Sequence, residues 1–80
     1  MDIMREIQDF LVTELAAERE SIAADENLLA HGIIDSMGIL SLVTFLETRF
    51  GIKTTDDDLI PENFETLHAL KAFVERKQAR

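Results

Sequence analysis

The sequence contains no cysteine, so its 80 residues can form neither a disulfide nor a thiolate-bound metal site. Stability must then come from helix packing, and the composition fits a reducing compartment. No uninterrupted apolar run approaches the roughly 20 residues that a membrane span requires. Residues 1–6 (MDIMRE) are acidic and lack the features of a signal or transit peptide. Because the chain is short, we expect one domain, residues 1–80, located in the cytoplasm.

Basic residues are scarce in this chain. Eight lysines and arginines stand against sixteen aspartates and glutamates, which gives a formal net charge of −8. Such a charge repels phosphate backbones and anionic membrane surfaces. The composition therefore argues against nucleic acid and membrane insertion, and it favours partner proteins that carry basic docking patches.

Apolar residues recur at three- and four-residue steps in three segments, the pattern of amphipathic helices. The first begins after Asp2, a suitable N-cap, and extends to about Leu15. The second spans residues 36–50 and is followed by Gly51, which suits the left-handed position after a last turn. The third begins near Glu65 or Thr66. On the core face of the second helix we expect Leu40, Val43, Leu46 and Phe50, with Ile39 and Leu42 beside them.

The remaining segments predict connections and one short helix. Residues 17–35 lack helical periodicity, but Ile22 and Leu28 are among apolar residues that predict an ordered loop, with one turn near Asp25. Residues 56–60 predict a short turn of helix that Pro61 ends. No alternating strand pattern is present. The predicted fold is therefore all-α, a four-helix bundle with three longer helices, one short helix and a long first loop.

A lone serine, Ser36, lies where the long loop becomes the second helix. The plain interpretation is structural, because serine is a favoured N-cap. The functional interpretation is that its hydroxyl lies beside free backbone N–H groups and the positive end of the helix dipole, which would stabilise a phosphodiester formed there. Asp35 could then engage the enzyme or metal that delivers the phosphate.

Two chemical alternatives to this interpretation are weak. A serine hydrolase needs a G-x-S-x-G elbow and a histidine base, whereas Ser36 lacks the flanking glycines and His31 and His68 are expected to be surface residues. The acidic run 56–58 does not match an EF-hand loop, since the sixth position counted from Asp56 is Pro61 rather than glycine. We therefore expect no catalytic residue and no metal ligand in this chain.

Four runs of sequence, in order, carry a family resemblance: residues 32–37 (GIIDSM), 46–52 (LETRFGI), 58–59 (DL) and 61–67 (PENFETL). Together they resemble an acyl carrier protein along essentially the whole chain. The resemblance implies a non-enzymatic phosphoprotein in which a phosphopantetheinyl transferase moves phosphopantetheine from coenzyme A onto Ser36. The terminal thiol then holds an acyl or aminoacyl group as a thioester. The magnesium of that loading reaction belongs to the transferase and coenzyme A.

The resemblance also implies which surface partner enzymes read. Asp35 belongs to the transferase recognition motif, and the second helix is the main docking element. Its outward residues would be Met37, Ser41, Thr44, Phe45, Glu47 and Thr48, with Gly38 near the start. For Phe45, an apolar docking patch and a place at the edge of the core both remain open.

This helix departs from carriers of fatty acid synthesis, which typically expose several acids here, because Glu47 is its only outward carboxylate. A neutral helix resembles specialised stand-alone carriers, such as D-alanyl carriers or those of secondary lipid and polyketide pathways. Fatty acid biosynthesis and lipid metabolism remain the broader expectation. Expected partners of this monomer are the transferase, an acyl- or aminoacyl-loading ligase, and downstream transferases or synthases. The alternative is an unmodified helical interaction module with a carrier-like fold.

Overall fold

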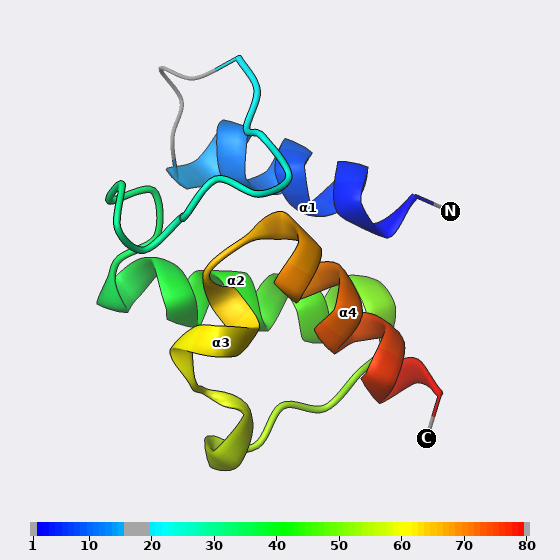
Figure 1. The fold of residues 1–80 in the computed structure, drawn as a ribbon. Coiled ribbons are helices and arrows are strands. Elements are labelled where there is room, and N and C mark those ends of the chain that lie inside the picture. The colour runs from blue at the N-terminus through cyan, green and yellow to red at the C-terminus, as the bar shows by residue number, and fades with distance from the viewer. Residues whose placement is uncertain (1, 16–19, 80) are drawn as a thin grey trace.

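The computed structural model describes residues 2–15 and 20–79, and within them the chain is helical with no strand (Figure 1). The main elements pack around one apolar cluster, with α4 contacting α1, α2 and α3. The all-α prediction is confirmed. In chain order the elements are α1 (Ile3–Phe10), the π-helical segment η1 (Leu11–Leu15), α2 (Ser36–Phe50), the 3₁₀ turn η2 (Asp56–Asp58), α3 (Pro61–Phe64) and α4 (Leu67–Gln78).

The first helix begins as predicted and ends differently. The Asp2 side chain accepts a hydrogen bond from the Arg5 N–H at 3.2 Å, which confirms Asp2 as the N-cap. After Phe10 the helix widens into η1, where π-type i→i+5 bonding changes the number of residues per turn. This wider turn alters the direction of the side chains at the end of the segment, up to Leu15. Sequence periodicity does not reveal the change.

Helix α2 has the predicted bounds, and Gly51 closes it with a φ of 67° while its N–H donates to the Glu47 carbonyl at 3.0 Å. The predicted core face is partly wrong. Leu42 and Leu46 are fully buried, whereas Leu40 is 64% exposed. Because successive residues rotate by 100°, a helix that buries Leu42 turns Leu40, two positions earlier, towards solvent.

The long connection between η1 and α2 is ordered over residues 20–35, as predicted, although residues 17–19 of that prediction lie outside the described residues. Ile22 is buried, and its N–H donates to the Gln8 side-chain oxygen at 2.8 Å. Leu28 is also buried, and its N–H donates to the Glu65 carbonyl at 2.7 Å. A turn lies at residues 24–25, near the predicted position. These bonds hold the connection on α1 and on the α3–α4 junction.

The predicted short helix is displaced. Residues 56–58 form only a 3₁₀ turn, and α3 begins at Pro61 instead of ending there. The physical reason is that proline at the first helical position has no N–H to leave unsatisfied and already has a helical φ. The segment bearing Leu59 and Ile60 therefore projects between two turns. Both side chains are more than 40% exposed, at 41% and 43%.

The core gathers apolar side chains from every helix and from the long connection. Its largest fully buried members include Phe64 and Phe73, whose ring centroids lie 5.7 Å apart. The described residues contain no helix that is both long and apolar enough to cross a bilayer. The buried cluster comprises Ile7, Leu11, Ile22, Leu28, Ile33, Ile34, Leu42, Leu46, Phe50, Ile52, Phe64, Leu67, Leu70, Phe73 and Val74.

One ion pair ties η2 to α4. The Asp58 carboxylate pairs with Lys77 and also accepts from the Thr55 N–H at 2.9 Å. The hydrogen bond from Lys77, followed by that from Thr55, lowers the pKa of Asp58 from 3.8 to about 2. Because folding lowers this pKa, the interaction stabilises the fold above pH 3.8, and the stabilisation is lost as pH falls through about 2.

Asp58→Asn should therefore lower the free energy of unfolding near neutral pH. Urea denaturation of both chains should show that this deficit shrinks as the pH falls below 3.8 and disappears near 2. Asp57→Asn is the matched control, because Asp57 is exposed in the same turn, and it should leave the unfolding curve unchanged at either pH. A deficit for Asp58→Asn that persists in acid would contradict the ionic explanation.

Candidate functional site

The N-terminus of α2 is capped by Asp35 and not by Ser36. Asp35 has an extended backbone, with φ −112° and ψ −171°, and its Oδ1 accepts from the Gly38 N–H at 2.7 Å. Its carbonyl accepts from the Ile39 N–H at 2.9 Å. Ser36 is the first helical residue. The plain structural interpretation of Ser36 as an N-cap is therefore wrong, since the neighbouring carboxylate occupies that role.

The Ser36 side chain is consequently available. Ser36 is exposed, and no hydrogen bond engages its Oγ within the part of the chain that the structure describes. The first turn of a helix presents N–H groups that have no intrahelical acceptor, and only that of Gly38 is satisfied by Asp35. The hydroxyl thus lies at the positive end of a 15-residue helix, where an attached phosphate is favoured.

Gly38 lets the first turn of α2 pack closely against η1. It is buried, unlike the outward position expected from the sequence. A Cβ at this position would lie 3.2 Å from Asp35 Oδ1 and 3.4 Å from Leu15 Cδ1. Glycine therefore allows η1 to approach without pushing the capping carboxylate away from its N–H partner.

Residues 32–34, which lead into the N-cap, are held in place by burial and by hydrogen bonds. Gly32 has a φ of 72°, in the left-handed region that glycine adopts without steric cost. Ile33 and Ile34 are buried, and both of their N–H groups donate to the Leu28 carbonyl, at 2.9 and 3.2 Å. Two buried side chains and two hydrogen bonds thus hold the backbone immediately before Asp35.

Exposed apolar residues lie near this site. Met37, a predicted partner-facing residue, is 77% exposed, and Leu40 is 64% exposed. Leu59 and Ile60 add exposed apolar area from the segment before α3. The exposure of Leu40, Leu59 and Ile60 was not predicted from the sequence. The available signal was that α2 carries more apolar residues than a single buried stripe can hold. A cavity of about 120 Å³ adjoins this surface, lined by Leu29, Ile39, Leu59, Ile60, Pro61 and Phe64.

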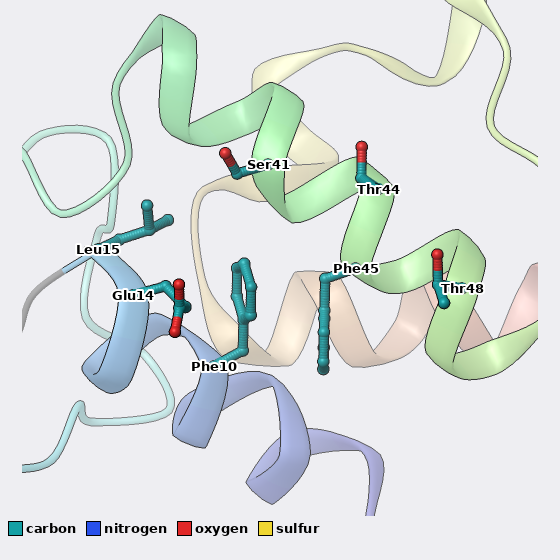
Figure 2. A pocket seen from close by; sticks show the side chains of 7 residues that line it. All are labelled: Phe10, Glu14, Leu15, Ser41, Thr44, Phe45 and Thr48. Atoms are coloured by element: carbon teal, nitrogen blue, oxygen red, sulfur yellow. The ribbon is translucent and has the colours of Figure 1, made fainter.

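The other α2 residues predicted to face partners have two different surroundings: most line a groove, and one contacts the segment after α2. Ser41, Thr44 and Thr48 are exposed and line a groove beside Phe10 (Figure 2). Phe45 is half-buried and stacks on Phe10, with ring centroids 4.4 Å apart. It therefore lies at the edge of the core, one of its two predicted positions, and still lines the groove. The Glu47 carboxylate accepts from the Thr54 N–H at 2.9 Å, so it is engaged with the segment after α2.

The remaining candidate polar residues are the acidic side chains and the two histidines. Residues 2–15 and 20–79 contain no group of three or more histidine, aspartate or glutamate side chains that could hold a metal ion. His31 and His68 are both exposed, as predicted, and His31 Nδ1 lies 3.0 Å from Glu26 Oε2. The site is thus a capped helix N-terminus with one exposed hydroxyl.

The division of roles between Asp35 and Ser36 can be tested on stability alone. Asp35→Ala should cost about 1 kcal/mol of unfolding free energy, because it removes the cap. Asp35→Ser keeps a capping oxygen and should retain most of that stability. Ser36→Ala should remain within about 0.5 kcal/mol of the wild type, since no cap is lost. Urea denaturation measures all three, and a larger loss for Ser36→Ala than for Asp35→Ala would reverse the assignment.

Comparisons with known proteins agree with this geometry. The family described as "Phosphopantetheine attachment site" matches residues 5–74. The D-alanyl carrier proteins of Streptococcus suis and Streptococcus sanguinis are 34% and 33% identical over 70 residues, which is 88% of this chain and 87% of theirs. That of Streptococcus thermophilus is 31% identical over the same length. Such proteins are stand-alone, non-catalytic carriers whose cofactor is covalently attached phosphopantetheine. The chain belongs to this acyl carrier family.

Proposed function

We propose that Ser36 is the attachment site and that the carried group is D-alanine. The observation that carries the first part is the division of roles at the head of α2, where Asp35 supplies the cap and leaves an exposed hydroxyl on Ser36. In the loading reaction, Ser36 Oγ forms a bond to the phosphorus nearer the pantetheine in coenzyme A. The bond from that phosphorus to the adenosine bisphosphate breaks, and the serine proton leaves to a base on the transferase.

The residues around Ser36 fit a phosphodiester. The attached phosphate would lie at the unsatisfied N–H groups of the first turn and at the positive end of the helix dipole. Asp35 remains exposed while one of its oxygens binds the Gly38 N–H. Its other oxygen can then take part in recognition by the transferase. The arm supplies a terminal thiol, which holds the carried group as a thioester.

The identity of the cargo is supported by the named relatives, which are D-alanyl carrier proteins. Cavity size gives independent support for a small cargo. The apolar cavity beside α2 has a volume of about 120 Å³. It does not enclose a long acyl chain without rearrangement of the helices. A D-alanyl group, with three carbons and an ammonium, needs no such enclosure.

The loading enzyme would dock mainly on the apolar side of the site. Met37 and Leu40 are the most exposed large apolar residues of the described chain, at 77% and 64%. The only carboxylate within α2, on Glu47, is bound to the Thr54 N–H. This arrangement favours recognition by burial of apolar area next to Ser36, with little contribution from charges on α2 itself.

Intact mass spectrometry tests the attachment site. Incubation with coenzyme A, magnesium and a broad-specificity transferase should add one phosphopantetheine to the wild type and none to Ser36→Ala. The Ser41→Ala control should be modified normally, because Ser41 lies within the helix, remote from its N-terminal N–H groups. A wild-type chain that gains no mass would instead support the unmodified interaction module.

The cargo and the docking surface are tested on the modified chain. With ATP and a ligase that adenylates D-alanine, the holo-chain should form a hydroxylamine-sensitive D-alanyl thioester, whereas a fatty-acyl ligase should load it poorly.

Leu40→Asp should raise the KM of that ligase for the carrier about 10-fold or more, because it places a charge in an interface that buries apolar area. His68→Asp is the control, since it adds a carboxylate at the exposed first turn of α4. Equal KM values for the two variants would exclude docking through Leu40.

A further inference from the structure

A second surface lies on the other flank of α2, between that helix and the end of α1 (Figure 2). Its volume is about 490 Å³. The stacked rings of Phe10 and Phe45 form its apolar part, and hydroxyl groups from α2 line one side. Glu14 and Leu15 line the other. This groove shares no lining residue with the small cavity that Ile39 lines.

The α1 side of the groove is acidic. A second hollow adjoins the first and shares Phe10, Phe45 and Glu14 with it, and it is also lined by Glu6 and Asp9. Glu6 forms an ion pair with Arg49, the cation in the last turn of α2. Asp9 and Glu14 are exposed, and no cation pairs with either of them within residues 2–15 and 20–79. Two carboxylates therefore border an aromatic surface without a described counter-charge.

The π-helical segment gives this arrangement its shape. Glu14 and Leu15 belong to η1, and both line the groove together with Phe10, the last residue of α1. In Figure 2 the Glu14 carboxylate and the Phe10 ring lie on the side of α1 that faces α2.

We propose that this groove receives an arginine side chain from the enzyme that loads the carrier. The inference rests on the proposed function for the identity of that enzyme. An arginine fits both halves of the surface, because its aliphatic stem can cover the rings while its guanidinium meets the carboxylates of Asp9 and Glu14. Planar guanidinium groups also stack on aromatic faces. The chain already pairs an arginine with this row of acids, since Arg49 contacts Glu6.

The position of the groove suits an enzyme bound at Ser36. Ser41 lines the groove five residues after Ser36, which corresponds to about 7.5 Å along the helix axis. A protein surface that covers Ser36, Met37 and Leu40 can therefore reach across α2 to the groove. Charge also favours a basic partner, because the chain carries a net charge of −8.

Direct binding to the purified apo-chain tests the groove without any enzyme. The probe is N-acetyl-arginine amide, compared with its uncharged analogue N-acetyl-citrulline amide, followed by the NMR signals of the Phe10 and Phe45 rings. Arginine amide should shift these signals in a saturable way, and the citrulline analogue should not. The shifts should be lost in the double variant Asp9→Asn, Glu14→Gln. Identical shifts from both probes, or none at all, would overturn the proposal.

Loading kinetics test the partner. With the D-alanine ligase at low salt, the double variant should raise the KM for the holo-carrier about 5- to 10-fold with kcat unchanged, and added salt should raise the wild-type KM towards that value. The matched control is Asp25→Asn with Glu75→Gln, which removes the same two charges from exposed sites on other elements. Equal KM values for the two double variants would overturn the role in docking. If the D-alanine ligase does not load the wild-type holo-carrier, the proposed cargo is refuted. Binding of N-acetyl-arginine amide to the apo-chain then tests the groove independently of the cargo.

Discussion

The hydrogen bond from the Gly38 N–H to the Asp35 carboxylate, at 2.7 Å, is the interaction on which the site depends. It places the N-cap of α2 at Asp35, so that Ser36 is the first helical residue and its hydroxyl makes no hydrogen bond within the described residues. Glycine at residue 38 favours this bond, because a Cβ there would lie in a tight contact of 3.2 Å with the same carboxylate oxygen. Buried Ile33 and Ile34 fix the approach. The cap and the exposed hydroxyl therefore belong to two neighbouring residues, Asp35 and Ser36.

A second constraint is the unequal character of the two flanks of α2. On one flank Ile39 lines an apolar cavity together with Leu59 and Ile60, and the neighbouring Leu40 is exposed. The other flank carries hydroxyl groups and faces the acidic side of α1 across Phe10. One helix thus offers apolar burial on one side and charge complementarity on the other. Burial supplies affinity, whereas charge mainly supplies association rate and selection among partners.

Much of this arrangement could be predicted from the sequence, and the failures have identifiable physical causes. The C-terminal end of α2 was predictable because Gly51 is a strong end signal, whereas the start was placed at the right residue although the cap is Asp35 and not Ser36. The exposure of Leu40 was not predictable, because the eight apolar residues of α2 allow more than one buried stripe, and only packing against the rest of the fold selects the stripe that is buried. Pro61 was misread because proline both ends and begins helices. The acidic groove depends on the π-helical turn, which leaves no periodic signature in the sequence.

The contacts of Glu47 explain why α2 presents almost no negative charge to a partner. Its only carboxylate, on Glu47, holds the Thr54 N–H and so serves the loop that follows the helix. Glu6, Asp9 and Glu14 lie on α1 and η1 and line the hollow beside Phe10 and Phe45. A partner that contacts α2 alone would meet almost no negative charge. A partner that contacts both α1 and α2 would meet carboxylates beside the rings of Phe10 and Phe45. Discrimination between carriers of similar fold can then arise from where the acids lie, with no change at the serine itself.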